Sequence, residues 1–232
     1  AVIENLNILM NIMNKFKAVF FDLDGTLIDS EYFYFQNWQP ILAEDFAIHI
    51  NFEDWIVHFA GHTLAVNIET MKRVWNVDTT DEYMWKRTRA AYAQSDMRTI
   101  ALMPYAKEIL EHLKEHQVKI GLVTSSYQTT VDTVLGQHDL LSYFSLIVTR
   151  DHVQSPKPDP EPYLLAAKQS GLNPKDCVAI EDTITGTKAA KAAGLYCIGV
   201  TKQPVEREKL IIADQLFTDL QEVWNYLKNN IS

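Results

Sequence analysis

Residues 17–26 read KAVFFDLDGT, an apolar run of strand-forming residues that ends in two aspartates and a glycine. Asp22 and Asp24 lie two residues apart, and side chains at that spacing point to the same side of an extended chain. Gly25 allows the chain to turn away sharply after them. Two carboxylates this close repel each other unless a cation joins them, which favours a metal site. The alternative is an aspartate-rich turn that caps a helix.

Similar apolar runs recur in the second half of the chain, at residues 118–124, 144–149, 177–180, 195–200 and 215–217. Such near-continuous hydrophobic runs are typical of strands that are covered on both faces. Apolar residues spaced three and four apart predict helices between them, for example at 105–116 and 160–170. Strands that alternate with helices through short connections predict a parallel sheet, here in a Rossmann-like three-layer α/β core.

The stretch 30–102 has a different composition from the rest of the chain. It holds one of the eight glycines, Gly61, one of the eight prolines, Pro40, and four of the five tryptophans. This predicts an all-helical domain inserted after the first strand, with the tryptophans in its core. We therefore expect three parts, which are an N-terminal extension without a catalytic role (1–15), an α/β core domain (16–29 and 103–232) and a helical cap domain (30–102).

Composition and charge exclude several classes of protein. Of the 232 residues, 47% are hydrophobic and 22% are charged, as in ordinary soluble proteins. The chain has 21 basic and 30 acidic residues, a net charge of −9, so it has no excess of cations for a nucleic acid or an anionic membrane surface. Cys177 and Cys197 lie in apolar runs, which favours buried thiols over a disulfide and fits the reducing cytoplasm. We expect a cytoplasmic monomer.

A second pair of acids follows another apolar run, in Ile180-Glu181-Asp182-Thr183. The carboxyl ends of parallel strands meet at one edge of a sheet, so this pair and the first would converge if their strands are neighbours. Four carboxyl groups in one crevice require a divalent cation, and all-oxygen ligands suit Mg²⁺. The alternative for Asp182 is the N-cap of the next helix.

Two further segments offer groups that bind phosphate. Thr124 and Ser125 follow the run at 118–124, and hydroxyl and N–H groups at a strand end can hold phosphate oxygens, although they are also common helix caps. Lys157 lies between two prolines in a stiff loop, where it can balance the charge of a phosphoryl group. The alternative is an ordinary solvated lysine.

Taken in order, DLDGT, TSS, KP and ED resemble the four motifs of the haloacid dehalogenase superfamily. The segment 20–30 is similar to the first motif, Thr124 to the second, Lys157 in KPDPEPY to the third, and Glu181 with Asp182 to the fourth. The resemblance covers the chain beyond its first dozen residues. The helical insert resembles the cap of the β-phosphoglucomutase-like branch of that superfamily.

The resemblance implies a role for each residue of the core motifs. Asp22 would be the nucleophile that forms an aspartyl-phosphate. Asp24 would be the general acid and base. Thr124 would donate a hydrogen bond to the transferred group, Lys157 would supply positive charge, and the N–H of Ser125 would be a further donor.

The resemblance also implies a Mg²⁺ site. The ion would bind Asp22, the backbone carbonyl of Asp24, and Asp182. Glu181 would be either a direct ligand or a neighbour of one.

The function that we expect is a Mg²⁺-dependent phosphatase of a small phosphorylated metabolite. By resemblance, a carboxylate at Asp24 favours phosphate esters over the substrates of the dehalogenases and the phosphonate-cleaving members. Gly61 and His62 are expected to contact substrate from the cap. A sugar phosphomutase is the alternative, but mutases of this branch carry Ser-Arg soon after the matching glycine, where this chain has His62-Thr63-Leu64. A binding module without turnover is a third possibility, which the complete set of motif residues disfavours.

Overall fold

The computed structural model describes residues 16–231, which divide into two compact units. The α/β unit runs up to Leu27 and continues from Leu102, and the helical unit is Ile28–Ala101. The expected N-terminal extension, 1–15, lies outside the described residues. The sequence prediction of an α/β core with an inserted all-helical domain is confirmed. Assignment of the helical unit as a cap over a site stays a prediction.

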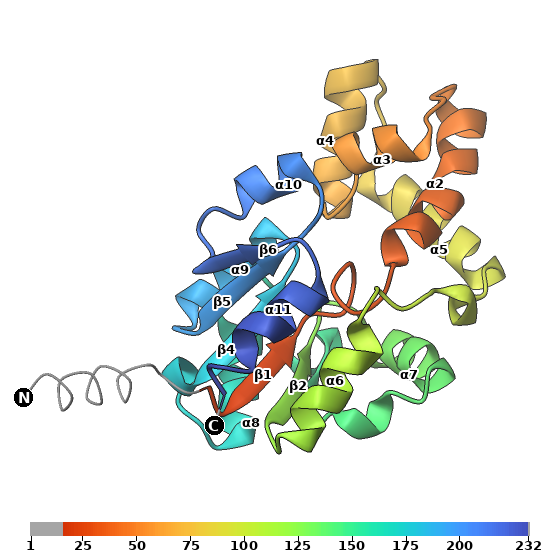
Figure 1. Ribbon diagram of the computed structural model, residues 1–232. Coiled ribbons are helices and arrows are strands. Elements are labelled where there is room, and N and C mark those ends of the chain that lie inside the picture. The colour runs from red at the N-terminus through yellow and green to blue at the C-terminus, as the bar shows by residue number, and fades with distance from the viewer. Residues whose placement is uncertain (1–15, 232) are drawn as a thin grey trace, which may run out of the picture. The chain divides into compact units, whose positions relative to one another are not determined.

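The α/β unit is built on one six-stranded parallel sheet with the strand order β3-β2-β1-β4-β5-β6 (Figure 1). Its strands are β1 (Ala18–Phe21), β2 (Lys119–Val123), β3 (Leu146–Val148), β4 (Cys177–Glu181), β5 (Tyr196–Val200) and β6 (Gln215–Phe217). At the centre of the sheet, Phe21 of β1 pairs with Leu122 of β2 on one side and with Ile180 of β4 on the other. The two strands that end in acid pairs are therefore neighbours.

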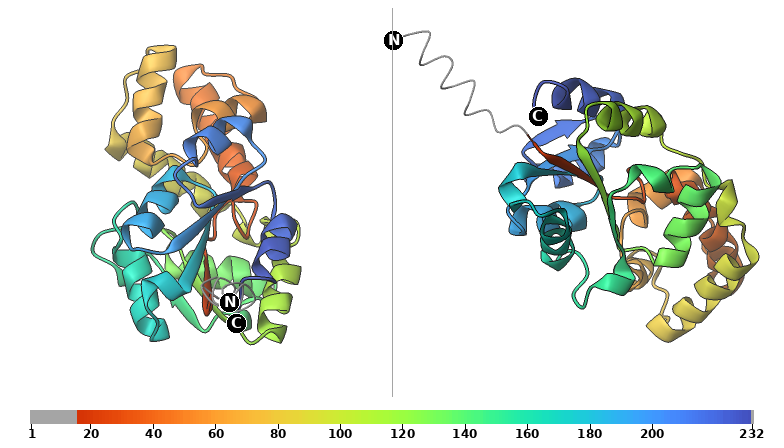
Figure 2. Two further views of the ribbon diagram at one scale, coloured as in Figure 1. Left: turned by 60° about the vertical axis from the view of Figure 1, so that its left-hand side comes forward. Right: turned by 90° about the horizontal axis from the view of Figure 1, so that it is seen from below.

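Helices cover both faces of this sheet, as the left view of Figure 2 shows. The helices are α6 (Ala106–Glu115), α7 (Gln128–Gln137), α8 (Glu161–Ser170), α9 (Ile184–Ala192), α10 (Pro204–Lys209) and α11 (Leu220–Leu227), with single 3-10 turns η2 (Leu141–Tyr143), η3 (Arg150–His152) and η4 (Pro174–Asp176). Helices α8 and α9 pack on one face, and α6 and α11 lie on the other.

Among the described residues, no helix has the length and apolar character that crossing a membrane would require.

The layer between the sheet and α8–α9 is a closely packed apolar core. Phe20 and Ala179 project from the sheet into it, against Tyr163 of α8. Cys177 and Cys197 belong to the same core, and neither forms a disulfide within the described part of the chain, as the sequence predicted. Strands covered on both faces account for the near-continuous hydrophobic runs.

The helical unit contains α2 (Ser30–Phe46), α3 (Phe52–His58), α4 (Leu64–Trp75), α5 (Asp81–Gln94) and the turn η1 (Met97–Thr99). The rings of Trp55, Phe59 and Trp75 form a continuous stack, with centroids 5.3 and 5.6 Å apart, and Trp38 packs on its side. Aromatic packing of this kind stabilises a small helical core. The fourth tryptophan, Trp85, is 54% exposed, so the prediction of a core position was wrong for this residue.

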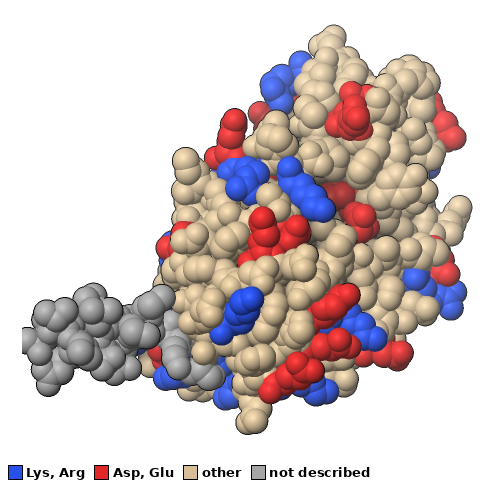
Figure 3. Space-filling model, in the orientation of Figure 1, with Lys and Arg blue, Asp and Glu red and all other residues tan. Residues whose placement is uncertain are grey.

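Charges on the face drawn in Figure 3 are mixed, with Lys and Arg interspersed among Asp and Glu. The cytoplasmic location and the monomeric state stay predictions.

The centre of the sheet leaves no room for a larger residue at Gly121 of β2. A Cβ atom there would lie 2.7 Å from Cδ1 of Phe20 and 2.9 Å from Cδ1 of Leu146. We predict that Gly121→Val lowers the free energy of unfolding by about 1–3 kcal/mol, the usual cost of overpacking. Gly136→Ala in α7 is the control, since its nearest neighbour would be 3.7 Å away and alanine favours a helix. Urea denaturation measures both, and equal stability of the two variants would contradict the packing described here.

Candidate active site

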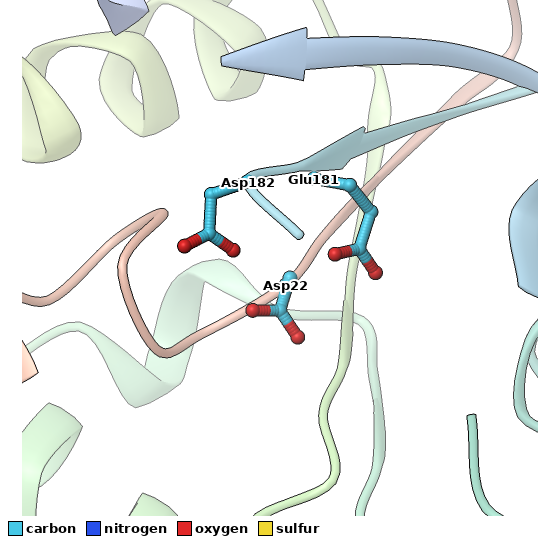
Figure 4. A group of neighbouring side chains, drawn as sticks. All are labelled: Asp22, Glu181 and Asp182. Atoms are coloured by element: carbon cyan, nitrogen blue, oxygen red, sulfur yellow. The ribbon is translucent and has the colours of Figure 1, made fainter. Parts of the chain in front are cut away.

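Three carboxylates meet at the carboxyl edge of the sheet (Figure 4). Asp22 follows β1, Glu181 is the last residue of β4, and Asp182 comes next. Each offers an oxygen, and these oxygens lie within 4.8 Å of one another. The N–H of Asp22 donates to the carbonyl of Ile180 at 3.0 Å, which extends the pairing of the two strands to the first acid. The structure thus brings together three of the four carboxylates that the sequence singled out.

Two glycines allow the backbone to approach these carboxylates. Gly25 has φ +76°, and a Cβ atom there would overlap Oδ2 of Asp182. A Cβ atom at Gly186, in α9, would overlap both carboxylate oxygens of Glu181. Thr26 also donates to Oδ1 of Asp182 at 3.4 Å. Glycine is therefore needed both in the turn after β1, at Gly25, and in the first turn of α9, at Gly186.

The ammonium of Lys157 lies inside the carboxylate cluster. It donates to Oδ1 of Asp22 at 2.6 Å, to Oε1 of Glu181 at 2.6 Å and to the carbonyl of Val123 at 2.8 Å. These contacts use all three donors of the ammonium group. The residue is only 8% exposed, so the alternative of a solvated loop lysine is wrong.

The electrostatics of the cluster favour an added cation. Burial raises the pKa of Asp22 to about 7, and the negative charges of Glu181 and Asp24 act in the same direction, while Lys157 opposes them. Burial disfavours the charged form of Lys157, but the adjacent Asp22 and Glu181 outweigh it and raise the pKa of this lysine. A divalent ion beside these carboxylates would reduce their mutual repulsion and favour their charged forms. The oxygen-only donor set of Asp22, Glu181 and Asp182 fits Mg²⁺.

Helix capping does not explain the polar residues at these strand ends. Thr183, and not Asp182, caps α9 by accepting from the N–H of Gly186 at 3.1 Å. The side chain of Thr124 is buried, and its hydroxyl accepts from the N–H of Ser126 at 3.0 Å. Thr124 lies four residues before the start of α7 at Gln128, whose N-cap is Tyr127. The capping alternatives for Asp182 and Thr124 are therefore wrong.

Two residues of the site escaped the sequence analysis. The hydroxyl of Ser126 donates to Oδ2 of Asp24 at 2.7 Å. The neighbouring Ser125 is exposed, and the role of its N–H as a donor stays a prediction. Tyr163 of α8 donates from its hydroxyl to Oε1 of Glu181 at 2.5 Å. Both were visible as residues of the TSS and KPDPEPY segments, but nothing in the pattern distinguished Ser126 from its neighbour or Tyr163 from an ordinary core residue.

Gly61 and His62 belong to the helical unit. Gly61 follows α3 with φ +70°, and its N–H donates to Oε1 of Glu31 at 3.1 Å. The other oxygen of Glu31 accepts from Nε1 of Trp55 at 2.8 Å. The loop is thus fixed to the start of α2 and to α3, and its contact with substrate stays a prediction.

The close approach of α9 to Glu181 can be tested through its effect on cation binding. Gly186→Ala should favour the helix by propensity, yet its methyl group would displace the Glu181 carboxylate. We expect Mg²⁺ affinity, measured by titration calorimetry, to fall on the order of 10–100-fold, as for other changes beside metal ligands. Gly136→Ala should bind as the unchanged protein does. Equal affinity in Gly186→Ala would contradict a role for Glu181 in the cation site.

Comparison with known proteins agrees with this architecture. Residues 19–200 match the sequence model of the haloacid dehalogenase-like hydrolase family. The chain is 31% identical to validoxylamine A 7'-phosphate phosphatase of Streptomyces hygroscopicus subsp. limoneus over 215 residues, which are 91% of this chain and 98% of that protein. It is 30% identical to β-phosphoglucomutase of Bacillus subtilis over 220 residues, 90% of this chain and 95% of that protein.

A solved structure shares the fold. A conserved haloacid dehalogenase-like protein from Agrobacterium tumefaciens aligns with a TM-score of 0.81 at 24% identity, over 92% of this chain and 98% of that one. The chain therefore belongs to the haloacid dehalogenase-like hydrolases, in the branch that includes β-phosphoglucomutase.

Proposed function

We propose that the protein is a Mg²⁺-dependent phosphatase that hydrolyses a small phosphorylated metabolite through an aspartyl-phosphate at Asp22. The observation that carries the proposal is the meeting of Asp22, Lys157 and Asp182 at the ends of two adjacent parallel strands. A relative named for its action on a phosphorylated compound, validoxylamine A 7'-phosphate phosphatase, supports the same reaction class.

Asp22 is suited to nucleophilic attack because one of its oxygens is held. Lys157 binds Oδ1, and we assign Oδ2 to the attack on phosphorus. A bond forms between this oxygen and phosphorus while the ester P–O bond breaks, which leaves the phosphoryl group on Asp22. A water molecule then attacks phosphorus, releases phosphate and restores the carboxylate.

We assign the proton transfers of both steps to Asp24. It gives a proton to the leaving alcohol oxygen and then takes one from the attacking water. The hydroxyl of Ser126 holds Oδ2 of Asp24 at 2.7 Å and thereby orients the carboxyl group. Lys157 binds the nucleophile directly, and Thr124 follows β2, the strand next to β1. We assign to this ammonium and this hydroxyl the stabilisation of charge on the transferred group.

Mg²⁺ would be held by Asp22 and Asp182, with Glu181 beside them, and would neutralise charge on the phosphoryl oxygens.

A sugar phosphomutase is the second candidate, because β-phosphoglucomutase of Bacillus subtilis matches nearly the whole chain. A mutase must bind a second phosphate group while the first is transferred, and a cationic side chain serves that purpose. After Gly61 the chain reads HTLAVNIETMK before the first arginine, Arg73. This sequence favours the phosphatase.

Substitution of the two motif aspartates tests the mechanism. Asp22→Asn should abolish release of p-nitrophenol from p-nitrophenyl phosphate, because the nucleophile is lost. Asp24→Asn should lower kcat on the order of 10²–10⁴-fold, the usual contribution of a general acid or base, and should still bind Mg²⁺. Asp132→Asn, on the exposed side of α7, is the matched control and should keep full activity. Full activity in Asp22→Asn would refute the nucleophile assignment.

The products distinguish the two candidates. With β-glucose 1-phosphate and Mg²⁺, the phosphatase proposal predicts free phosphate and no glucose 6-phosphate, which ³¹P NMR resolves. Accumulation of the 6-phosphate without phosphate release would establish the mutase instead. A panel of phosphorylated metabolites, assayed by phosphate release, would then identify the preferred substrate.

A further inference from the structure

Tyr163 reaches the carboxylate cluster from the helix layer beneath the sheet. The residue is wholly buried, and its ring packs in the apolar core between α8 and the sheet, beside Phe20 and Ala179. Its hydroxyl donates to Oε1 of Glu181 at 2.5 Å. A buried tyrosine hydroxyl needs a hydrogen-bond partner, whereas a phenylalanine could fill the same apolar space without one.

The same tyrosine also contacts the lysine of the cluster. The ammonium of Lys157 lies 5.1 Å from the centroid of the Tyr163 ring and donates to the same oxygen of Glu181 at 2.6 Å. A cation above an aromatic ring is attracted by the negative face of the ring. Tyr163 therefore touches the carboxylate through its hydroxyl and the ammonium through its ring.

The two oxygens of Glu181 consequently have different surroundings. Oε1 accepts two hydrogen bonds, from Lys157 and Tyr163, which is its usual capacity. Oε2 is buried and has no hydrogen-bond partner among the described residues. The carboxylate cannot turn freely, because Gly186 lies against it where even a methyl group would overlap.

We propose that Tyr163 is a positioning residue of the Mg²⁺ site. Its hydroxyl, with Lys157, fixes Oε1 of Glu181, so that Oε2 is the oxygen of this side chain left for the cation. This inference rests on the proposed function, since it assumes that the cluster binds Mg²⁺. It assigns a role to a core residue that does not itself touch the substrate or the ion.

Tyr163→Phe tests the proposal because it removes the hydroxyl and keeps the ring. We expect Mg²⁺ affinity, measured by titration calorimetry without substrate, to fall on the order of 10–100-fold. At saturating Mg²⁺, kcat should fall while KM for p-nitrophenyl phosphate stays within about twofold, since the substituted group acts through Glu181 rather than on substrate. The midpoint of urea denaturation checks that the variant is folded. If Tyr163→Phe does not fold, Tyr163→Met is measured in its place.

Tyr196→Phe is the matched control. It also loses one hydroxyl contact, a 2.8 Å hydrogen bond to Tyr226, but lies at the start of β5, away from the carboxyl edge. This variant should keep the Mg²⁺ affinity and kcat of the unchanged protein.

A double substitution shows whether Tyr163 acts through Glu181. In a Glu181→Gln background, Tyr163→Phe should cause no further loss of Mg²⁺ affinity, whereas independent effects would multiply. Unchanged Mg²⁺ affinity in Tyr163→Phe, or multiplied losses in the double variant, would overturn the positioning role. Absence of Mg²⁺ binding in the unchanged protein would instead overturn the proposed function, so the two failures are distinguishable.

Discussion

The ammonium of Lys157 binds two carboxylates, Asp22 and Glu181, at a place where little water reaches them. Charges removed from water cost several kcal/mol each unless they are paired and fully hydrogen-bonded. All three donors of the ammonium are used, and Oε1 of Glu181 receives a second donor from Tyr163. Asp182 places a third carboxylate beside this pair, with oxygens of all three side chains within 4.8 Å of one another. The site is therefore arranged for one more positive partner.

The parallel sheet makes this arrangement possible. β1 and β4 are adjacent and in register, so the residues that follow them come out at one edge beside each other. Both strands are buried, and the only charged residue within them is Glu181, the last residue of β4. Asp22 and Asp182 directly follow the two strands. Gly25 and Gly186 then let the following turn and helix approach the carboxylates closely. The net charge of −9 describes the whole chain, whereas the proposed binding of a phosphate group depends on this single cluster with a cation.

The sequence predicts the parts of this structure that depend on local pattern. Apolar runs located the strands, and a change in composition located the helical unit. Acid pairs directly after two runs predicted the convergence of Asp22, Glu181 and Asp182, because parallel strands end at one edge. Contacts between distant loops were not predictable in this way. The position of Lys157 between two carboxylates depends on the path of its loop. In the sequence, Tyr163 is one of the apolar residues of the α8 pattern, which gives no sign that its hydroxyl reaches Glu181.

In the proposed enzyme, one divalent cation completes the buried ion cluster beside the nucleophile. A crystal structure of the protein grown with MgCl₂ and aluminium fluoride, a mimic of the transferred phosphoryl group, tests it most directly. We expect one Mg²⁺ at about 2.0–2.1 Å from oxygens of Asp22 and Asp182. Lys157 should still bind Asp22, and the fluoride group should lie in line with the Asp22 carboxylate. An ion bound elsewhere, or a fluoride group away from Asp22, would contradict it.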